Sequence, residues 1–401
     1  MGRPPVSEPK DAVASMRLTR QERAEMKEIA KSLGFRSFGD YVRFLHNKSQ
    51  DEVKLARKSK APAKEGKLTL FHTTKYGKIY NGDSLDYLFY KAKPKSVNLI
   101  VTSPPFGLTR QKSYGNEDAD QYCKWFRPFA EGFRRVLKED GSLVIDIGGA
   151  WKPGIPTRSL YHYELLIMLC KEFGFHLCQE HYWWNPAKLP TPAEWVNVRR
   201  VRVKDAVNCI WWLSLTPFPK ANNRRVLSPY SSAMHNLLEN GYKPNLRPSG
   251  HDISDKFQKN NGGAVPPNLL AIANTESQSQ YLDYCRDKGI KPHPARFPQL
   301  LPEYFIRLLT DSGDLVLDPF AGSCVTGMVA ERMKRKWVAV EMNSEYLRGA
   351  LSRFSQPTIT SKSSNKKLKP TVYEISSPCP IPVDETEIKL AGDGGAFRRR
   401  K

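Results

Sequence analysis

The sequence predicts an α/β fold in which a mostly parallel β-sheet is covered by helices on both faces. Seven segments have the apolar or alternating pattern of strands, at residues 78–82, 97–102, 142–148, 176–184, 207–214, 315–318 and 337–341. Helical patterns of apolar residues fall between several of them, at 120–138, 159–173, 300–310, 323–335 and 344–354. Because strands and helices alternate along the chain, a parallel sheet between two helical layers is expected.

Length and composition fit a soluble protein that stays inside the cell. The 401 residues suffice for one large domain or two, and 40% of them are hydrophobic. No apolar run approaches the ~20 residues that a membrane span needs, and the chain begins without an apolar signal segment. The seven cysteines include no CxxC pair and no Cys/His spacing suited to zinc. Neither a disulfide nor a metal site is therefore expected.

The balance of charge favours a polyanionic partner. The formal net charge is +22, and residues 186–300 alone hold 16 Lys and Arg against 8 Asp and Glu. Charge by itself is equally compatible with a solvated basic surface, so motifs must decide between the two readings.

Composition divides the chain into five parts. We expect disorder over 1–14, a small helical module over 15–50, a linker over 51–70, the main domain over 71–354 and a disordered basic tail over 355–401. Within the main domain, 215–292 is rich in Pro, Asn, Ser and Gly and lacks a sustained period. It is expected to be an irregular insertion, and insertions of this length are usually functional.

The N-terminal module has the order strand, helix, turn, helix. A short strand is expected at 15–19, Thr19 and Glu22 are spaced as a capping box, and Ser37 starts a second helix. This order resembles a ribbon-helix-helix module, which pairs two chains through the strand and lays the ribbon in a DNA groove. A helical hairpin that packs on the main domain or serves dimerisation remains an equal alternative.

The second of two motifs, Asp318 to Ser323 (DPFAGS), has features of a nucleoside site. A strand that ends in an acid and turns through Gly322 into a helix brings backbone N–H groups to one spot. Phe320 offers an apolar ring, and Glu341 at the end of the next strand offers an acceptor for ribose hydroxyls. The G-x-G-x-x-G of dinucleotide-binding proteins is absent, and a structural turn remains the alternative.

The first motif, Thr102 to Phe106 (TSPPF), also follows an apolar strand. Pro104 and Pro105 remove two N–H donors, so the backbone presents carbonyl oxygens. An exocyclic amino group that donates to a carbonyl and to Ser103 turns its lone pair away from the ring and becomes a better nucleophile. Phe106 offers a face on which a base can stack. Ligands gather at the carboxyl ends of strands in α/β sheets, so both motifs are expected to line one crevice.

Together these motifs resemble the β-group of amino-methyltransferases that act on DNA, and within it the N4-cytosine enzymes of restriction-modification systems. The resemblance runs from about residue 71 to 354. It rests on the order of matched segments NGDSLDYL, TSPPFGL, YGN, GSLVIDIGGA, YWWNPAKLP, EWVNVRRVRVKDAVN, RPSGHDI, NNGGAVPPNLL, HPARFP and DPFAGS. It implies a methyltransferase-type Rossmann-like sheet of seven strands, with a target recognition region at about 186–290.

The resemblance assigns roles residue by residue. Ser103, Pro104, Pro105 and Phe106 would form the pocket for the target cytosine. S-adenosylmethionine would be held by Asp83, His293, Asp318, Phe320, Gly322, Ser323 and Glu341. The family often has Gly where Cys324 stands, so the approach of the cofactor to this loop is expected to differ. The basic run Arg199, Arg200, Arg202 and Lys204 is expected to contact DNA.

The implied function is methyl transfer from S-adenosylmethionine to N4 of cytosine in double-stranded DNA. Within the same chemistry, N6-adenine methylation is the alternative, although adenine enzymes usually carry an acidic residue or Asn where Ser103 stands. A catalytically silent DNA-binding regulator is the alternative from another class, and an RNA methyltransferase is a third. The resemblance suggests a palindromic site such as CAGCTG and a cognate endonuclease that forms no stable complex. A cytoplasmic, nucleoid-associated enzyme without a membrane partner, and a homodimer through 15–50, complete the expectation.

Overall fold

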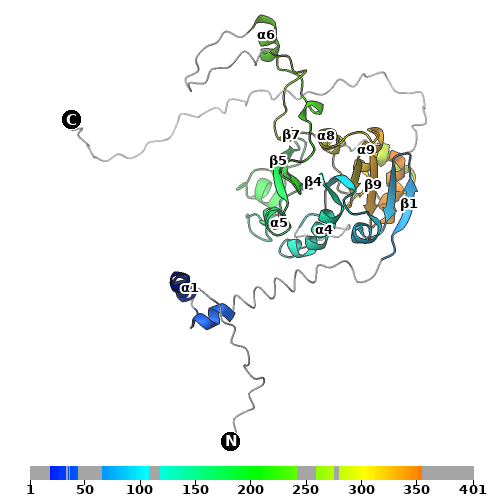
Figure 1. Ribbon diagram of the computed structural model, residues 1–401. Coiled ribbons are helices and arrows are strands. Elements are labelled where there is room, and N and C mark those ends of the chain that lie inside the picture. Colours follow the sequence, from blue (N-terminus) through cyan, green and yellow to red (C-terminus); the bar gives the residue numbers. More distant parts are fainter. Residues whose placement is uncertain are drawn as a thin grey trace, which may run out of the picture. The chain divides into compact units, whose positions relative to one another are not determined.

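The computed structural model describes residues 19–32, 35, 37–43, 66–107, 118–241, 259–274 and 280–354 (Figure 1). Predictions for 1–18, for most of the linker and for the tail lie outside these residues. The matched segments YGN at Tyr114 and RPSGHDI at Arg247 also lie outside them.

A nine-stranded sheet with the order β1-β2-β9-β8-β3-β4-β6-β5-β7 forms the main domain (Figure 1). Its strands are β1 (Thr69–Thr73), β2 (Gly77–Asn81), β3 (Val97–Thr102), β4 (Leu137–Ile147), β5 (His176–Trp184), β6 (Val207–Ser214), β7 (Leu269–Ala271), β8 (Leu315–Asp318) and β9 (Lys336–Glu341). Strands β2, β9, β8, β3 and β4 are mutually parallel, and β6 runs antiparallel to β4 and β5. The mostly parallel α/β sheet predicted from the sequence is confirmed.

All seven expected strands are present, and β3, β5, β6 and β8 have the expected bounds. Two short edge strands raise the count from seven to nine. β1 pairs antiparallel with β2 and begins at Thr69, so the main domain starts before residue 71 and inside the expected linker. β7 is three residues long and lies in the expected irregular insertion, where it pairs with β5.

Helices cover both faces of this sheet, as the alternating pattern predicts. They are α3 (Ser84–Asp86), α4 (Tyr122–Val136), α5 (Tyr161–Lys171), α8 (Leu300–Leu309), α9 (Val325–Arg332) and α10 (Ser344–Ala350), with short turns η1 (Tyr87–Lys91), η2 (Glu194–Val198) and η6 (Leu351–Arg353). Side chains of β4 alternate between the two layers. Leu143 and Ile145 pack with α4 and α5, whereas Val144 packs with α8 and α9.

The expected irregular insertion contains more regular structure than its composition predicts. Besides β7, it forms η3 (Asn223–Arg225), α6 (Ser232–Asn240) and α7 (Gln280–Asp287). The Ser231 hydroxyl accepts a hydrogen bond from the Met234 N–H at 3.3 Å and caps α6. Both helices are short, so neither gives a sustained period in the sequence. No helix within the described part of the chain is long and apolar enough to cross a membrane.

Near the N-terminus, α1 (Arg20–Ser32) begins at the predicted capping box, directly after Thr19. The Thr19 hydroxyl accepts from the Glu22 N–H at 3.2 Å, and the Glu22 carboxylate accepts from the Thr19 N–H at 2.8 Å. Helical residues 38–43 follow Ser37, whose hydroxyl accepts from the Asp40 N–H. The expected strand lies, apart from Thr19, outside the described residues, so the ribbon-helix-helix module stays a prediction.

Candidate active site

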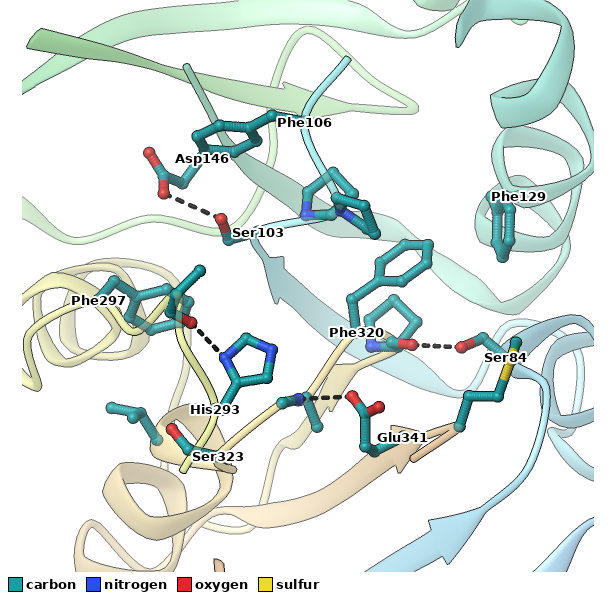
Figure 2. A pocket seen from close by; sticks show the side chains of 18 of the residues that line it. Ser84, Ser103, Phe106, Phe129, Asp146, His293, Phe297, Phe320, Ser323 and Glu341 are labelled. Atoms are coloured by element: carbon teal, nitrogen blue, oxygen red, sulfur yellow. Dashed lines mark hydrogen bonds between the residues drawn. The ribbon is translucent and has the colours of Figure 1, made fainter. Parts of the chain in front are cut away.

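The carboxyl ends of β2, β9, β8, β3 and β4 meet at one edge of the sheet, because these strands are parallel and adjacent. A cavity of about 510 Å³ lies there, a volume typical of small-molecule sites. β8 is followed along the chain by β9 on one side and β3 by β4 on the other, so the strand order switches between β8 and β3, and α/β sheets bind ligands at such switch points. Ser103 from the first motif and Gly322 from the second both line this cavity (Figure 2). The two motifs therefore share one site.

The first wall contains the Ser103 hydroxyl, whose hydrogen is already donated to a carboxylate. Ser103 follows β3 and its hydroxyl donates to the carboxylate of Asp146 at 3.1 Å (Figure 2). The Asn208 amide donates to the other carboxylate oxygen at 3.0 Å. Burial raises the pKa of Asp146 to about 6, so the carboxyl is mostly ionised at neutral pH. The Ser103 oxygen can therefore turn its lone pairs to a donor in the cavity.

The rest of this wall is apolar and tightly fitted. Pro104, Pro105 and Phe106 line the cavity as expected. A side chain on Gly148, which follows β4, would bring its Cβ within 2.6 Å of the Phe106 ring. Gly148 thus allows the ring to lie against the end of β4, where a flat base could stack on it.

The second wall is a glycine turn held by a carboxylate. Gly322 has φ +50, and a Cβ there would lie 3.1 Å from the His293 ring. Its N–H donates to Glu341 Oε2 at 2.8 Å (Figure 2). The Asn343 N–H donates to Glu341 Oε1 at 2.9 Å. Burial raises the pKa of Glu341. Each carboxylate oxygen keeps a lone pair beyond these bonds, and the residue lines the cavity.

Asp318 differs from the expectation, because its side chain does not line the cavity. It is 2% exposed, accepts from the Thr102 hydroxyl at 2.8 Å and accepts from the Phe320 N–H at 3.1 Å. Burial raises its pKa to about 6. The carboxyl therefore joins the ends of β3 and β8 and shapes the loop from behind.

Aromatic rings form the side of the cavity that α4 provides. Phe320 lies 4.9 Å from Phe129 and 5.9 Å from Trp125, measured between ring centres, and all three line the cavity. Trp125 and Phe129 lie in the helix predicted at 120–138, for which no site role was expected. Their helical spacing does not distinguish a core position from a cavity position.

The remaining expected ligand residues also reach the cavity. Asp83 caps α3 by accepting from the Leu85 N–H at 2.8 Å, and the Ser323 hydroxyl accepts from Arg353 at 3.3 Å. The His293 ring donates from Nδ1 to the carbonyl of Ala295. Burial lowers the pKa of His293 to about 4, so the ring is neutral and Nε2 carries the lone pair.

Cys324, the departure from the family pattern, points away from the cavity. It is fully buried with φ +56, a conformation that a non-glycine residue rarely adopts. A Cβ on Gly327 would lie 2.7 Å from its sulfur, so the thiol packs inside α9 and does not line the cavity. The Cys324 thiol therefore makes no contact with the cavity in which the cofactor was expected to approach this loop.

The basic run lies on an exposed loop between β5 and β6, and most of it holds the loop together. Arg199 pairs with Glu194, the Arg202 guanidinium donates to the carbonyl of Pro156 at 3.1 Å, and Lys204 donates to backbone carbonyls. Arg200 is exposed with φ +54 and has no hydrogen bond or ion pair to other described residues. It is the member of the run that is most available to a partner.

Three further residues of the site went unassigned in the sequence. Asp146, Trp183 and Asn208 line the cavity at the ends of β4, β5 and β6. Asp146 stands within the apolar run Val144 to Ile147, and burying a carboxylate there costs free energy unless it is paired or hydrogen-bonded. That carboxyl was the signal that could have identified this part of the site.

Comparison with known proteins agrees with this geometry. A family model described as DNA methylase matches residues 97–352. The chain is 51% identical over 292 residues to the type II methyltransferase M.PvuII of Proteus hauseri, covering 72% of this chain and 87% of that protein. It is 27% identical to the DNA adenine methyltransferase YhdJ of Escherichia coli, covering 69% and 81% respectively.

A solved structure gives the same result for the fold. The structure described as PvuII DNA methyltransferase (cytosine-N4-specific) aligns with a TM-score of 0.59 at 45% identity, over 72% of this chain and 89% of that chain. The residues that the family model matches include both walls of the cavity. This chain therefore belongs to the DNA methylase family.

Proposed function

We propose that this chain transfers a methyl group from S-adenosylmethionine to the exocyclic N4 of cytosine in double-stranded DNA, as the modification enzyme of a restriction-modification system. The observation that carries the proposal is one cavity with a Ser103–Asp146 pair on one wall and the Gly322–Glu341 turn on the other. The relative whose printed description is cytosine-N4-specific supports the choice of base.

The second wall suits a nucleoside with a charged methionine end. Glu341 presents carboxylate oxygens for ribose hydroxyls, and Phe320 and Phe129 present apolar rings beside them. Gly322 lets the backbone come close to a ligand because it has no Cβ. When bound, S-adenosylmethionine supplies an electrophilic methyl group on sulfur. Asp83, His293 and Ser323 would hold its remaining polar groups.

The first wall prepares the amino group to attack. A cytosine must leave the duplex, at a cost of a few kcal/mol, and stacking on Phe106 offsets part of that cost. Ser103 Oγ and the Pro104 carbonyl accept the two amino hydrogens, which directs the nitrogen lone pair toward the donor. Proximity in one cavity supplies much of the rate. The surplus proton can pass through Ser103 to the ionised Asp146.

Two alternatives are weaker. N6-adenine methylation would use the same fold, and an adenine enzyme is among the relatives, but at 27% identity rather than 51%. A silent DNA-binding regulator would not need both motifs to face one cavity.

Mapping of modified bases tests the proposed function. The chain is expressed in a host without N4-cytosine methylation, and its DNA is sequenced with a method that distinguishes N4-methylcytosine from N6-methyladenine. We expect N4-methylcytosine at a palindrome such as CAGCTG. N6-methyladenine at a fixed site would replace the proposed base, and unmodified DNA would favour the regulator.

The finer partner assignments are also proposals. We propose double-stranded DNA as the substrate, a cognate endonuclease that forms no stable complex with this chain, and association with the nucleoid. Homodimerisation through residues 15–50 belongs to the same set, supported by the capped helix that follows Thr19.

Replacing Asp146 with Asn is expected to stabilise the protein and slow the reaction. Burial raises the Asp146 pKa from 3.8 to about 6, so the native state binds the proton more tightly than the unfolded state. Stability is therefore lost as pH rises from about 4 to 6, by up to ~3 kcal/mol. Asn removes this loss, so the melting temperature should rise at pH 8 and change little at pH 4.

Turnover of the Asp146→Asn variant should fall by ~10²-fold. Asn208 requires the acceptor oxygen of residue 146, so the new amide presents its NH₂ to Ser103 and occupies a lone pair there. Asp283→Asn, at an exposed carboxyl on α7, is the control and should change neither property. Equal melting shifts at both pH values, or unchanged turnover, would contradict the role of Asp146.

Replacing Arg200 with Ala is expected to weaken the salt dependence of DNA binding. Each phosphate contact contributes about 0.9 to the slope of log K against log salt, so the slope should fall by about that amount. Arg199→Ala should change the slope less, because Glu194 already pairs with that guanidinium. Lys336→Ala is the charge-matched control, because Lys336 is at the amino end of β9, whereas the cavity lies at the carboxyl ends of the strands. A slope unchanged even when Arg199, Arg200, Arg202 and Lys204 are all replaced would remove this loop from the interface.

A further inference from the structure

Two buried tyrosine hydroxyls donate to backbone carbonyls beside the target pocket. Tyr122, the first residue of α4, donates to the carbonyl of Pro105 at 2.8 Å. Tyr161, the first residue of α5, donates to the carbonyl of Gly148. The two rings are 0% and 1% exposed and meet edge to face, with ring centres 4.8 Å apart. The resemblance and the proposed function give these tyrosines no role.

The TSPPF loop needs support of this kind. Pro104 and Pro105 have no N–H, so neither residue can fasten the loop by donating a backbone hydrogen bond. The carbonyl of Pro105 is an acceptor only, so a donor must come from elsewhere. Tyr122 supplies it, and burial holds the pKa of this phenol well above its usual value, which keeps the hydrogen in place.

The bond to Pro105 determines which carbonyl faces the target base. The Tyr122 hydroxyl holds the Pro105 carbonyl toward α4, and this leaves the carbonyl of Pro104, a residue that lines the cavity, available to a ligand there. Beyond Phe106, a Cβ on Gly107 would lie 3.1 Å from the Tyr161 ring. The tyrosines thus fix the backbone on both sides of Phe106.

We propose that Tyr122, supported by Tyr161, is a positioning residue for methyl transfer, which holds the Pro105 carbonyl out of the cavity so that the Pro104 carbonyl accepts the target amino hydrogen. This proposal rests on the proposed function and adds a residue that acts through the loop. Tyr122 does not line the cavity and so does not touch the base.

The test is Tyr122→Phe, which removes one oxygen and keeps the ring contact with Tyr161. In single turnover, the rate of N4-methylcytosine formation should fall about five- to tenfold, the effect of one hydrogen bond. Dissociation constants for S-adenosylmethionine and DNA, and base extrusion reported by 2-aminopurine fluorescence, should stay within about twofold. Tyr87→Phe is the matched control, since this buried phenol lies in η1 outside the cavity, and its rate should not change.

A double-mutant cycle with Ser103→Ala measures the coupling between Tyr122 and Ser103 in the rate of methyl transfer, which a general loss of stability would not produce. If Tyr122 acts on the same amino group, its effect should shrink in the Ser103→Ala background. Tyr161→Phe gives a second variant with a smaller loss of rate, and it decides the matter if Tyr122→Phe does not fold.

Two outcomes would overturn the proposal. One is a Tyr122→Phe rate equal to that of the wild type or of Tyr87→Phe, and the other is an effect fully retained in the Ser103→Ala background. The wild type is measured in the same assay. If the wild type itself forms no N4-methylcytosine, the proposed function is wrong. If the wild type forms it and Tyr122→Phe is equally fast, only the proposed role of Tyr122 is wrong.

Discussion

Replacing Ser103 with Ala is expected to lower turnover by ~10²-fold or more while DNA binding persists. The hydroxyl is the acceptor whose hydrogen Asp146 already holds, so its loss leaves the target amino group with one acceptor and no route for the surplus proton. The proposed DNA contacts lie on the loop that carries Arg200, so affinity for the recognition duplex should change by less than about twofold. Rapid-quench measurement of methyl transfer and a binding titration at one salt concentration would establish both quantities.

Ser312→Ala provides the matched control for the loss of a hydroxyl. Among the described residues, that hydroxyl hydrogen-bonds only the carbonyl of Lys334, at 3.4 Å, and Ser312 does not line the cavity. A Ser103→Ala enzyme as fast as this control would remove Ser103 from the reaction. A parallel loss of turnover and DNA affinity would indicate a structural role.

Replacing Gly322 with Val should abolish useful binding of S-adenosylmethionine. Gly322 has φ +50, which a β-branched residue strongly resists, and its Cβ would press on the His293 ring at 3.1 Å. The turn can relax only by giving up the N–H bond to Glu341. We expect a loss of about a hundredfold in affinity, equivalent to about 2.7 kcal/mol, measured by calorimetric titration.

Gly313→Val separates this effect from backbone strain. Gly313 has φ +84 but nothing within 4 Å of a Cβ, and it does not line the cavity. Both variants should lose stability, but only Gly322→Val should lose affinity. Equal affinities for the cofactor in the two variants would show that the turn does not form its binding site.

The sequence was most reliable where burial alone sets the pattern. β3 and β8 are covered on both faces, so they appear as short apolar runs, and their ends coincide with the first polar residues of the two motifs. Ser103, which follows β3, lines the cavity, whereas Asp318, the predicted site residue at the end of β8, is buried behind its loop. β7 was missed because three residues in a stretch rich in Pro, Asn and Gly give too little pattern.

Details that depend on side-chain direction could not be predicted. Trp125 and Phe129 pack against the core and also line the cavity, and their spacing, typical of a buried helix face, predicts only the first of these contacts. Asp318 faces inward behind its loop, because Thr102 from the neighbouring strand donates to it. In the basic run, charge alone could not show that Arg199 pairs with Glu194 whereas Arg200 does not pair with any described residue.

The pairing of β3 with β8 joins Thr102 and Asp318 across 216 positions of the chain. A nascent polypeptide that has left the ribosome only as far as residue 300 has the Ser103 wall but no strand to complete the sheet beside it. Proteins begin to fold from the N-terminus during synthesis, yet a product of this chain that stops before Gly322 cannot carry both walls. Premature termination before residue 341 should yield an inert protein rather than a weakened one, and modification of DNA starts only once β9 has been made.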